Sequence, residues 1–145
     1  MLFPYKDDNP RVLVPYVTYA IISINVLIFV LQLNMAMVNS SIEREFIYKF
    51  GFIPANFSFF TMFTSMFLHG GFSHIFGNMW FLWVFGDNVE GILGHIKFGI
   101  FYLLCGLVAT MSQLFVNPES TIPMVGASGA IAGVLGMYMI RFPHA

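Results

Sequence analysis

The chain has 145 residues, of which 58% are hydrophobic, 18% are aromatic and only 9% are charged. Soluble domains carry about 25% charged residues, so this composition argues strongly against a water-soluble fold. The formal net charge of −1 offers no basic surface for binding a nucleic acid. The single cysteine, Cys105, lies in an apolar segment and is expected to be an unreactive core residue.

Four apolar segments predict the architecture, because a membrane-spanning helix needs about 20 apolar residues. They cover approximately residues 16–38, 72–86, 93–116 and 126–142. The first is longer than the apolar region of a signal peptide, so we expect a retained helix. Polar and glycine residues between positions 86 and 91 predict a turn after the second. The expected fold class is all-α, a polytopic helix bundle in which residues 1–145 form one membrane domain.

The connection from residue 39 to about residue 60 mixes charged and apolar residues. Phe46, Ile47 and Phe50 lie among glutamate, arginine and lysine side chains. This pattern is compatible with a segment lying in the membrane interface and equally with a solvated loop.

The placement of Lys and Arg predicts the orientation. With the N-terminus inside, four of these residues lie inside and two outside, which favours that topology. The inside residues are Lys6, Arg11, Lys97 and Arg141, and the outside ones are Arg44 and Lys49. In either topology His69, His74 and Ser128 share one side of the membrane, and His95 and His144 lie on the other.

His74 and Asn78 are polar residues within the second apolar segment. Their i, i+4 spacing places them on one helical face, about 6 Å apart along the axis. Two fixed hydrogen-bond donors suit the stabilisation of an oxyanion. The alternative is that they join neighbouring helices by hydrogen bonds. A metal site at His69 and His74 is disfavoured, because no carboxylate or cysteine accompanies them.

Ser128 lies near the start of the fourth segment, within the sequence Gly126-Ala127-Ser128-Gly129-Ala130. Glycines at positions 126, 129, 133 and 136 could form a close helix-packing seam in which Ser128 is one more small residue. Ser128 could instead be a nucleophile at a helix N-terminus, where backbone N–H groups hold an oxyanion. A helix over 126–142 spans roughly 25 Å, less than the hydrocarbon core, so Ser128 is expected below the membrane surface.

A serine nucleophile needs a base within hydrogen-bond reach. His95 and His144 lie on the opposite side, His69 sits at a glycine-rich break, and His74 suits the oxyanion role better. The sequence therefore offers no convincing general base.

The chain resembles the rhomboid family of intramembrane serine proteases. The resemblance rests on the segment from His69 to Asn78, on the Phe85-Gly86, Val89-Glu90 and Gly94 positions, and on the motif around Ser128. Asp7-Asp8-Asn9-Pro10 also resembles bacterial members. The chain matches the first four helices of the family's six-helix core.

The resemblance implies that Ser128 is the nucleophile and that His74, Asn78 and the Ser128 backbone N–H stabilise the oxyanion. His69, Gly126 and Gly129 would have supporting roles. The family's catalytic histidine lies on the sixth helix, for which the glycine seam would be the packing partner, so the 145-residue chain alone is expected to be inactive. The implied activity is cleavage of peptide bonds in or near transmembrane segments by acyl transfer, without a cofactor or metal.

The implied partners are a transmembrane protein substrate and the lipid bilayer. The expected location is a bacterial inner membrane with the N-terminus inside. One alternative is a rhomboid-like protein that binds transmembrane segments without cutting them. A channel or transporter component is disfavoured, because the spans lack charged residues near their centres.

Overall fold

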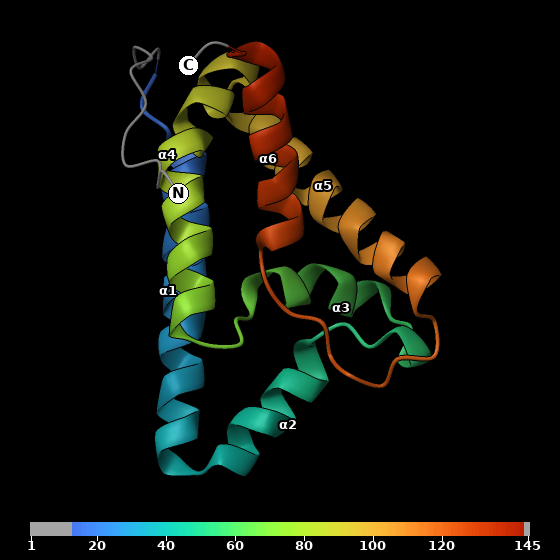
Figure 1. Ribbon diagram of the computed structural model, residues 1–145. Coiled ribbons are helices and arrows are strands. Elements are labelled where there is room, and N and C mark those ends of the chain that lie inside the picture. Colours follow the sequence, from blue (N-terminus) through green and yellow to red (C-terminus); the bar gives the residue numbers. More distant parts are fainter. Residues whose placement is uncertain (1–12, 144–145) are drawn as a thin grey trace.

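The computed structural model describes residues 13–143, which form an all-helical bundle (Figure 1). The α-helices are α1 Tyr16–Val38, α2 Ser40–Phe50, α3 Phe59–Thr64, α4 Phe72–Leu93, α5 His95–Val116 and α6 Ser128–Arg141. Two short 3₁₀ turns are η1 Pro54–Asn56 and η2 Ser65–Phe67. Within the described residues, β structure is limited to one isolated antiparallel bridge between Phe52 and Met124.

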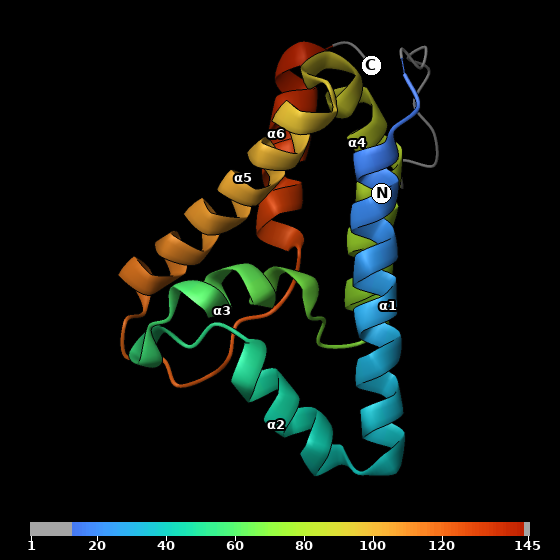
Figure 2. The same ribbon diagram turned by 180° about the vertical axis from the view of Figure 1, so that it is seen from behind.

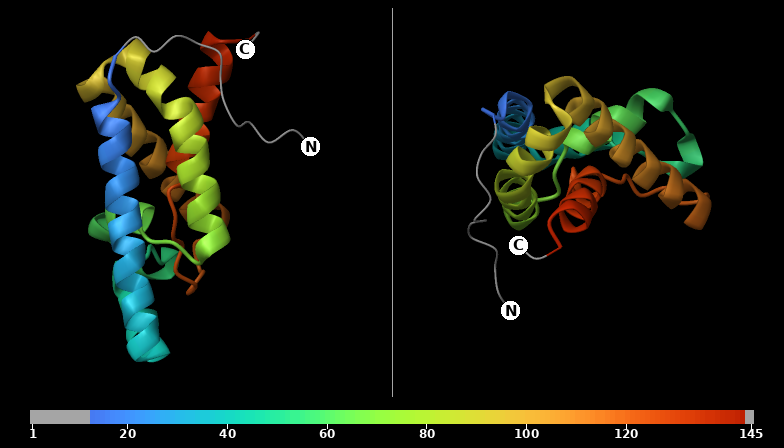
Figure 3. Two further views of the ribbon diagram at one scale, coloured as in Figure 1. Left: turned by 90° about the vertical axis from the view of Figure 1, so that its left-hand side faces the viewer. Right: turned by 90° about the horizontal axis from the view of Figure 1, so that it is seen from above.

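The long helices pack around one apolar core. Helices α1 and α4 run side by side, and α6 packs against both α4 and the inclined helix α5 (Figures 1 and 2). Helix α2 follows the far end of α1, and α3 lies beside α5 (Figures 1 and 3). The core residues come from α1, η2, α4, α5 and α6, and they are Ile21, Met66, Leu82, Val89, Phe98, Tyr102, Ala127, Ala130, Ile131, Val134 and Tyr138.

Two helices, α1 and α5, are long and apolar enough to cross a membrane. Helix α1 covers the same residues as the first apolar segment of the sequence. Helix α6 has 14 residues, or roughly 21 Å, which is shorter than the hydrocarbon core of a bilayer. Together with the apolar composition, these helices describe a helical membrane bundle.

Helix α4 differs from its expected length. It begins at Phe72, where the sequence places it, but it continues to Leu93 through the residues expected to form a turn. Gly86 does not break it, because this glycine permits close contact with α1: a Cβ there would lie 2.9 Å from Thr18 Cγ2. The actual break is Gly94, whose φ of +76° favours glycine.

Two glycines of α6 form the close helix-packing seam that the sequence predicts, and their partner among the described residues is α5. A Cβ at Gly129 would collide with Ala109, and one at Gly133 would collide with Cys105, both on α5. These two glycines therefore let α6 approach α5 closely, and they also line an apolar groove of about 380 Å³ between the two helices. Only Gly136, among the glycines of α6, has open space where a Cβ would stand.

The connection between α5 and α6 is fixed by the segment that follows α2. Phe52 and Met124 exchange two backbone hydrogen bonds of 3.0 and 2.7 Å. The Ala55 N–H donates to the Ser120 carbonyl at 3.0 Å, and the Gly126 N–H donates to the Ser65 carbonyl at 2.8 Å. These contacts position the start of α6.

Helix α2 is a regular helix. It lies in the connection for which the sequence pattern predicted either an interface segment or a solvated loop. The Asn39 side chain caps it by accepting the Ser41 N–H at 2.9 Å. The rings of Phe46 and Phe50 contact each other at a tilt of 52°, and Phe50 also contacts Phe60 of α3. The Phe50 ring of α2 thus packs on α3, and Lys49 Nζ lies 5.5 Å from the centroid of the same ring.

Candidate active site

Ser128 is the first residue of α6, and its side chain is exposed. The first backbone bond of this helix joins the Ile131 N–H to the Ala127 carbonyl at 3.0 Å. The N–H groups of Ser128, Gly129 and Ala130 therefore point out of the helix end without an intrahelical acceptor. Such an end carries a partial positive charge that favours a developing anion.

The imidazole of His74 lies against the backbone just before Ser128. A Cβ at Gly126 would lie 2.6 Å from His74 Cε1 and 2.7 Å from His74 Nε2. Gly126 also has a φ of +119°, a conformation that L side chains rarely adopt. The glycine two residues before Ser128 is thus required both by the backbone and by the histidine.

Asn78 lies one turn after His74 on α4 and is buried. Its Nδ2 is 3.1 Å from Nε2 of His69, which is also buried. The rings of His69 and His74 meet edge to face, with centroids 5.2 Å apart. His69, His74 and Asn78 therefore form one cluster at the end of α4 that approaches Ser128.

His69 lies in the loop before α4, outside the spanning helices. Burial, reinforced by the neighbouring His74, lowers the pKa of its ring from 6.5 to about 4. The ring is therefore neutral near pH 7, with one nitrogen free to accept a hydrogen bond.

A small cavity of about 100 Å³ adjoins Ser128 between η2, α5 and α6. Its walls include Ser128, Gly126 and Gly129 together with Met66, Gly106 and Thr110. None of the described residues that line it is charged. An uncharged pocket beside unpaired backbone N–H groups is a setting in which hydrogen bonds to an anion are strong.

The six site residues expected from the sequence lie at one end of the bundle. Ser128, Gly126 and Gly129 come from α6 and its preceding residues, and His69, His74 and Asn78 from α4 and its preceding loop. The described residues contain no group of three metal-ligating side chains. His144 lies outside the described residues.

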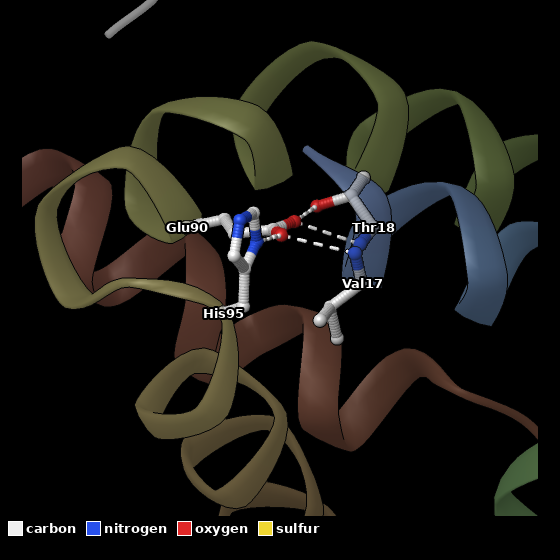
Figure 4. Close-up of polar contacts among 4 residues, drawn as sticks. All are labelled: Val17, Thr18, Glu90 and His95. Carbon is white, nitrogen blue, oxygen red and sulfur yellow. Dashed lines mark hydrogen bonds and ion pairs between the residues drawn. The ribbon is translucent and has the colours of Figure 1, made fainter. Parts of the chain in front are cut away.

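A second polar cluster, which the sequence did not reveal, lies at the opposite end of α4 (Figure 4). The Glu90 carboxylate is fully buried and accepts backbone N–H groups from Val17 at 2.9 Å and Thr18 at 2.8 Å. It also accepts the Thr18 hydroxyl at 2.7 Å and His95 Nδ1 at 2.5 Å. Glu90 thereby caps the N-terminus of α1 from another helix. Because Val17 and Thr18 lie some 70 positions before Glu90, the local sequence gave no signal of this capping role.

A family model described as the Rhomboid domain matches residues 56–145. The chain belongs to the rhomboid family. Its fold as an all-helical membrane bundle agrees with this membership.

Three curated rhomboid relatives match between 84% and 99% of the chain. It is 31% identical to Rhomboid protein 1, mitochondrial, of Saccharomyces cerevisiae, over 99% of the chain and 40% of that protein. It is 32% identical to Rhomboid protease GluP of Bacillus subtilis, over 84% of the chain and 24% of that protein. A third relative, Presenilin-associated rhomboid-like protein, mitochondrial, of Pongo abelii, is 33% identical over 86% of the chain and 32% of its own length.

The chain thus spans less than half the length of these relatives. No solved structure matches it significantly.

Proposed function

We propose that this rhomboid chain carries the nucleophile and the oxyanion-stabilising residues of an intramembrane serine endopeptidase. Its substrates would be membrane proteins, cut in or near their transmembrane segments. Ser128 is the nucleophile, and His74, Asn78 and the Ser128 backbone N–H stabilise the oxyanion. The observation that carries the proposal is the contact of the His74 ring with Gly126, two residues before Ser128.

The reaction follows from these positions. Ser128 Oγ attacks the carbonyl carbon of the scissile bond and gives its proton to a general base. The oxygen of the tetrahedral intermediate becomes negative and accepts hydrogen bonds from the three donors. Collapse breaks the C–N bond, and the leaving amine takes the proton from the base. Water then attacks the acyl ester and restores the serine.

The base is expected from the sixth helix of the family. Among the described residues, His95 is held by Glu90 at the opposite end of α4, and Ser128 Oγ makes no hydrogen bond to another residue. An unpaired, exposed hydroxyl is accessible both to a substrate carbonyl and to a base from another element. We further propose a bacterial inner membrane location with the N-terminus inside.

Reconstitution tests this proposal. The complete gene product is placed in liposomes with a membrane-spanning peptide substrate, and cleavage is followed by mass spectrometry. Wild type should cut the peptide, and Ser128→Ala should lower kcat by about 10³-fold or more. Ser112→Ala removes an exposed hydroxyl on α5 and should leave kcat unchanged.

The alternative is a rhomboid-like protein that binds transmembrane segments without cutting them. It would be supported by wild-type protein that retains the peptide in the liposome but yields no fragments. Equal cleavage by wild type and Ser128→Ala would overturn the nucleophile assignment.

A further inference from the structure

Gln32 is a buried polar residue near the end of α1 that belongs to no motif of the sequence. It is the last of five buried residues on one face of α1, which are Thr18, Ile21, Asn25, Phe29 and Gln32. A fully buried amide in an apolar helix is costly unless its polar atoms are paired. Gln32 therefore needs a partner outside α1.

The partner of Gln32 is the backbone of His69. Gln32 Nε2 donates to the His69 carbonyl at 2.9 Å, and the His69 N–H donates to Gln32 Oε1 at 3.1 Å. This two-bond pairing resembles a step of a β-ladder, with a side-chain amide in place of a strand. It fixes both the position and the orientation of the His69 peptide unit.

The side chain of His69 links this pairing to Asn78. Its Nε2 lies 3.1 Å from Asn78 Nδ2. Because an amide nitrogen only donates, Nε2 must be the acceptor and the ring must be neutral. This bond selects the orientation of the Asn78 amide. One N–H of Asn78 points to His69, and the second N–H of the same nitrogen remains for another acceptor.

We propose that Gln32 is a positioning residue for the oxyanion site. It holds His69 so that His69 orients the Asn78 amide toward the oxygen that becomes negative. This inference rests on the proposed protease function and deepens it, since it extends the machinery from α4 and α6 to α1. Gln32 touches no substrate and acts only through His69 and Asn78.

The first test measures turnover. Gln32→Leu removes both hydrogen bonds to His69 in the complete gene product. Misplacement of a donor by about 1 Å can cost up to about 10²-fold, so kcat should fall about 10- to 100-fold while KM changes less than about 2-fold. Asn25→Leu is the matched control: Asn25 is equally buried on α1, but it donates to the Ile21 carbonyl of its own helix. Asn25→Leu should have the kcat of wild type. An equal loss of kcat in Gln32→Leu and Asn25→Leu would overturn the proposal.

Gln32→Glu provides a pH-dependent rescue. A buried carboxyl stays protonated well above its usual pKa, so it can donate and accept as the amide does. Its kcat relative to wild type should be highest at low pH and fall as the carboxyl ionises, because a carboxylate cannot donate to the His69 carbonyl. If the ratio of the Gln32→Glu kcat to the wild-type kcat does not change with pH, the positioning role is contradicted. This test decides the question even if Gln32→Leu does not fold.

A second readout does not depend on proteolysis. Nitrogen-15 NMR of the imidazole rings in micelles should show His69 as a neutral ring that accepts at Nε2. In Gln32→Leu its pKa should rise from about 4 toward 6.5 as the ring leaves its buried place. A wild type that never cleaves, combined with this rise, would reject the protease and show only that Gln32 holds the His69 ring in its buried place. An unchanged His69 titration would reject the positioning whatever the activity.

Discussion

The two ends of α4 hold polar groups that are bonded in opposite ways. At one end Glu90 is fully buried, and its two carboxylate oxygens accept four hydrogen bonds. At the other end Ser128 is exposed beside a cavity, and its hydroxyl bonds to no described residue. Glu90, the more expensive group to bury, is satisfied and therefore structural. Ser128 is left available and therefore suits chemistry.

The largest expected effect comes from removing the satisfied group. Glu90→Ala leaves two N–H groups and a hydroxyl at the start of α1 without an acceptor. The free energy of unfolding in micelles should fall by about 3 kcal/mol. Turnover per folded molecule should stay close to wild type, because Glu90 lies away from Ser128. Unfolding curves and active-site-normalised kcat measure the two quantities.

Glu119→Ala is the control for Glu90→Ala, since Glu119 is exposed in the loop before α6. It should change the free energy of unfolding by less than about 0.5 kcal/mol. If Glu90→Ala is as stable as this control, the Glu90 cluster does not hold the fold together.

A smaller effect is expected at the Ser128 end from Gly126→Ala. The added methyl meets the His74 ring, and the backbone at φ +119° becomes strained. The free energy of unfolding should fall by about 1–3 kcal/mol, and kcat should fall because His74 must move. Gly136→Ala is the matched change on α6, where a Cβ meets open space. It should be neutral or stabilise the helix by up to about 1 kcal/mol; similar losses in both variants would contradict the role of the His74 contact.

The smallest effect is a pH dependence from His69. Its pKa is about 4 in the folded protein and near 6.5 when unfolded, so the unfolded chain binds more protons between these values. His69 therefore contributes its full stability above pH 6.5, and this contribution is lost as the pH falls toward 4. Subtracting the pH profile of His69→Gln from that of wild type isolates the effect. A difference that is flat between pH 6.5 and 5 would show that His69 titrates normally.

The fold could be predicted where the apolar pattern is continuous. Helix α1 coincides with the first apolar segment because no glycine or charge interrupts it. The predicted end of helix α4 came too early, because Gly86 and Glu90 are typical of a turn in the local sequence. Their role depends on Thr18, some 70 residues earlier, and no local pattern contains that information.

The site could be predicted as a set of residues but not as a geometry. Counting helices places His69, His74 and Ser128 at one end, and the structure groups them there. The contact of His74 with Gly126 depends on the loop before α6, which is held by Phe52 and Ser65. The glycine seam was predicted as a close helix contact, but periodicity does not identify which neighbouring helix that face meets, and in the structure it meets α5. The role of Gln32 could not be predicted, because its partner is the backbone of His69, which forms no side-chain motif with it.

Site-resolved labelling by a fluorophosphonate tests the central claim most directly. The complete gene product in micelles is treated with the probe, digested and examined by mass spectrometry. The account predicts one modified serine, Ser128, with labelling lost in Ser128→Ala and retained in folded Glu90→Ala. Modification at another serine, or cleavage of a membrane substrate by a protein whose Ser128 stays unmodified, would contradict it.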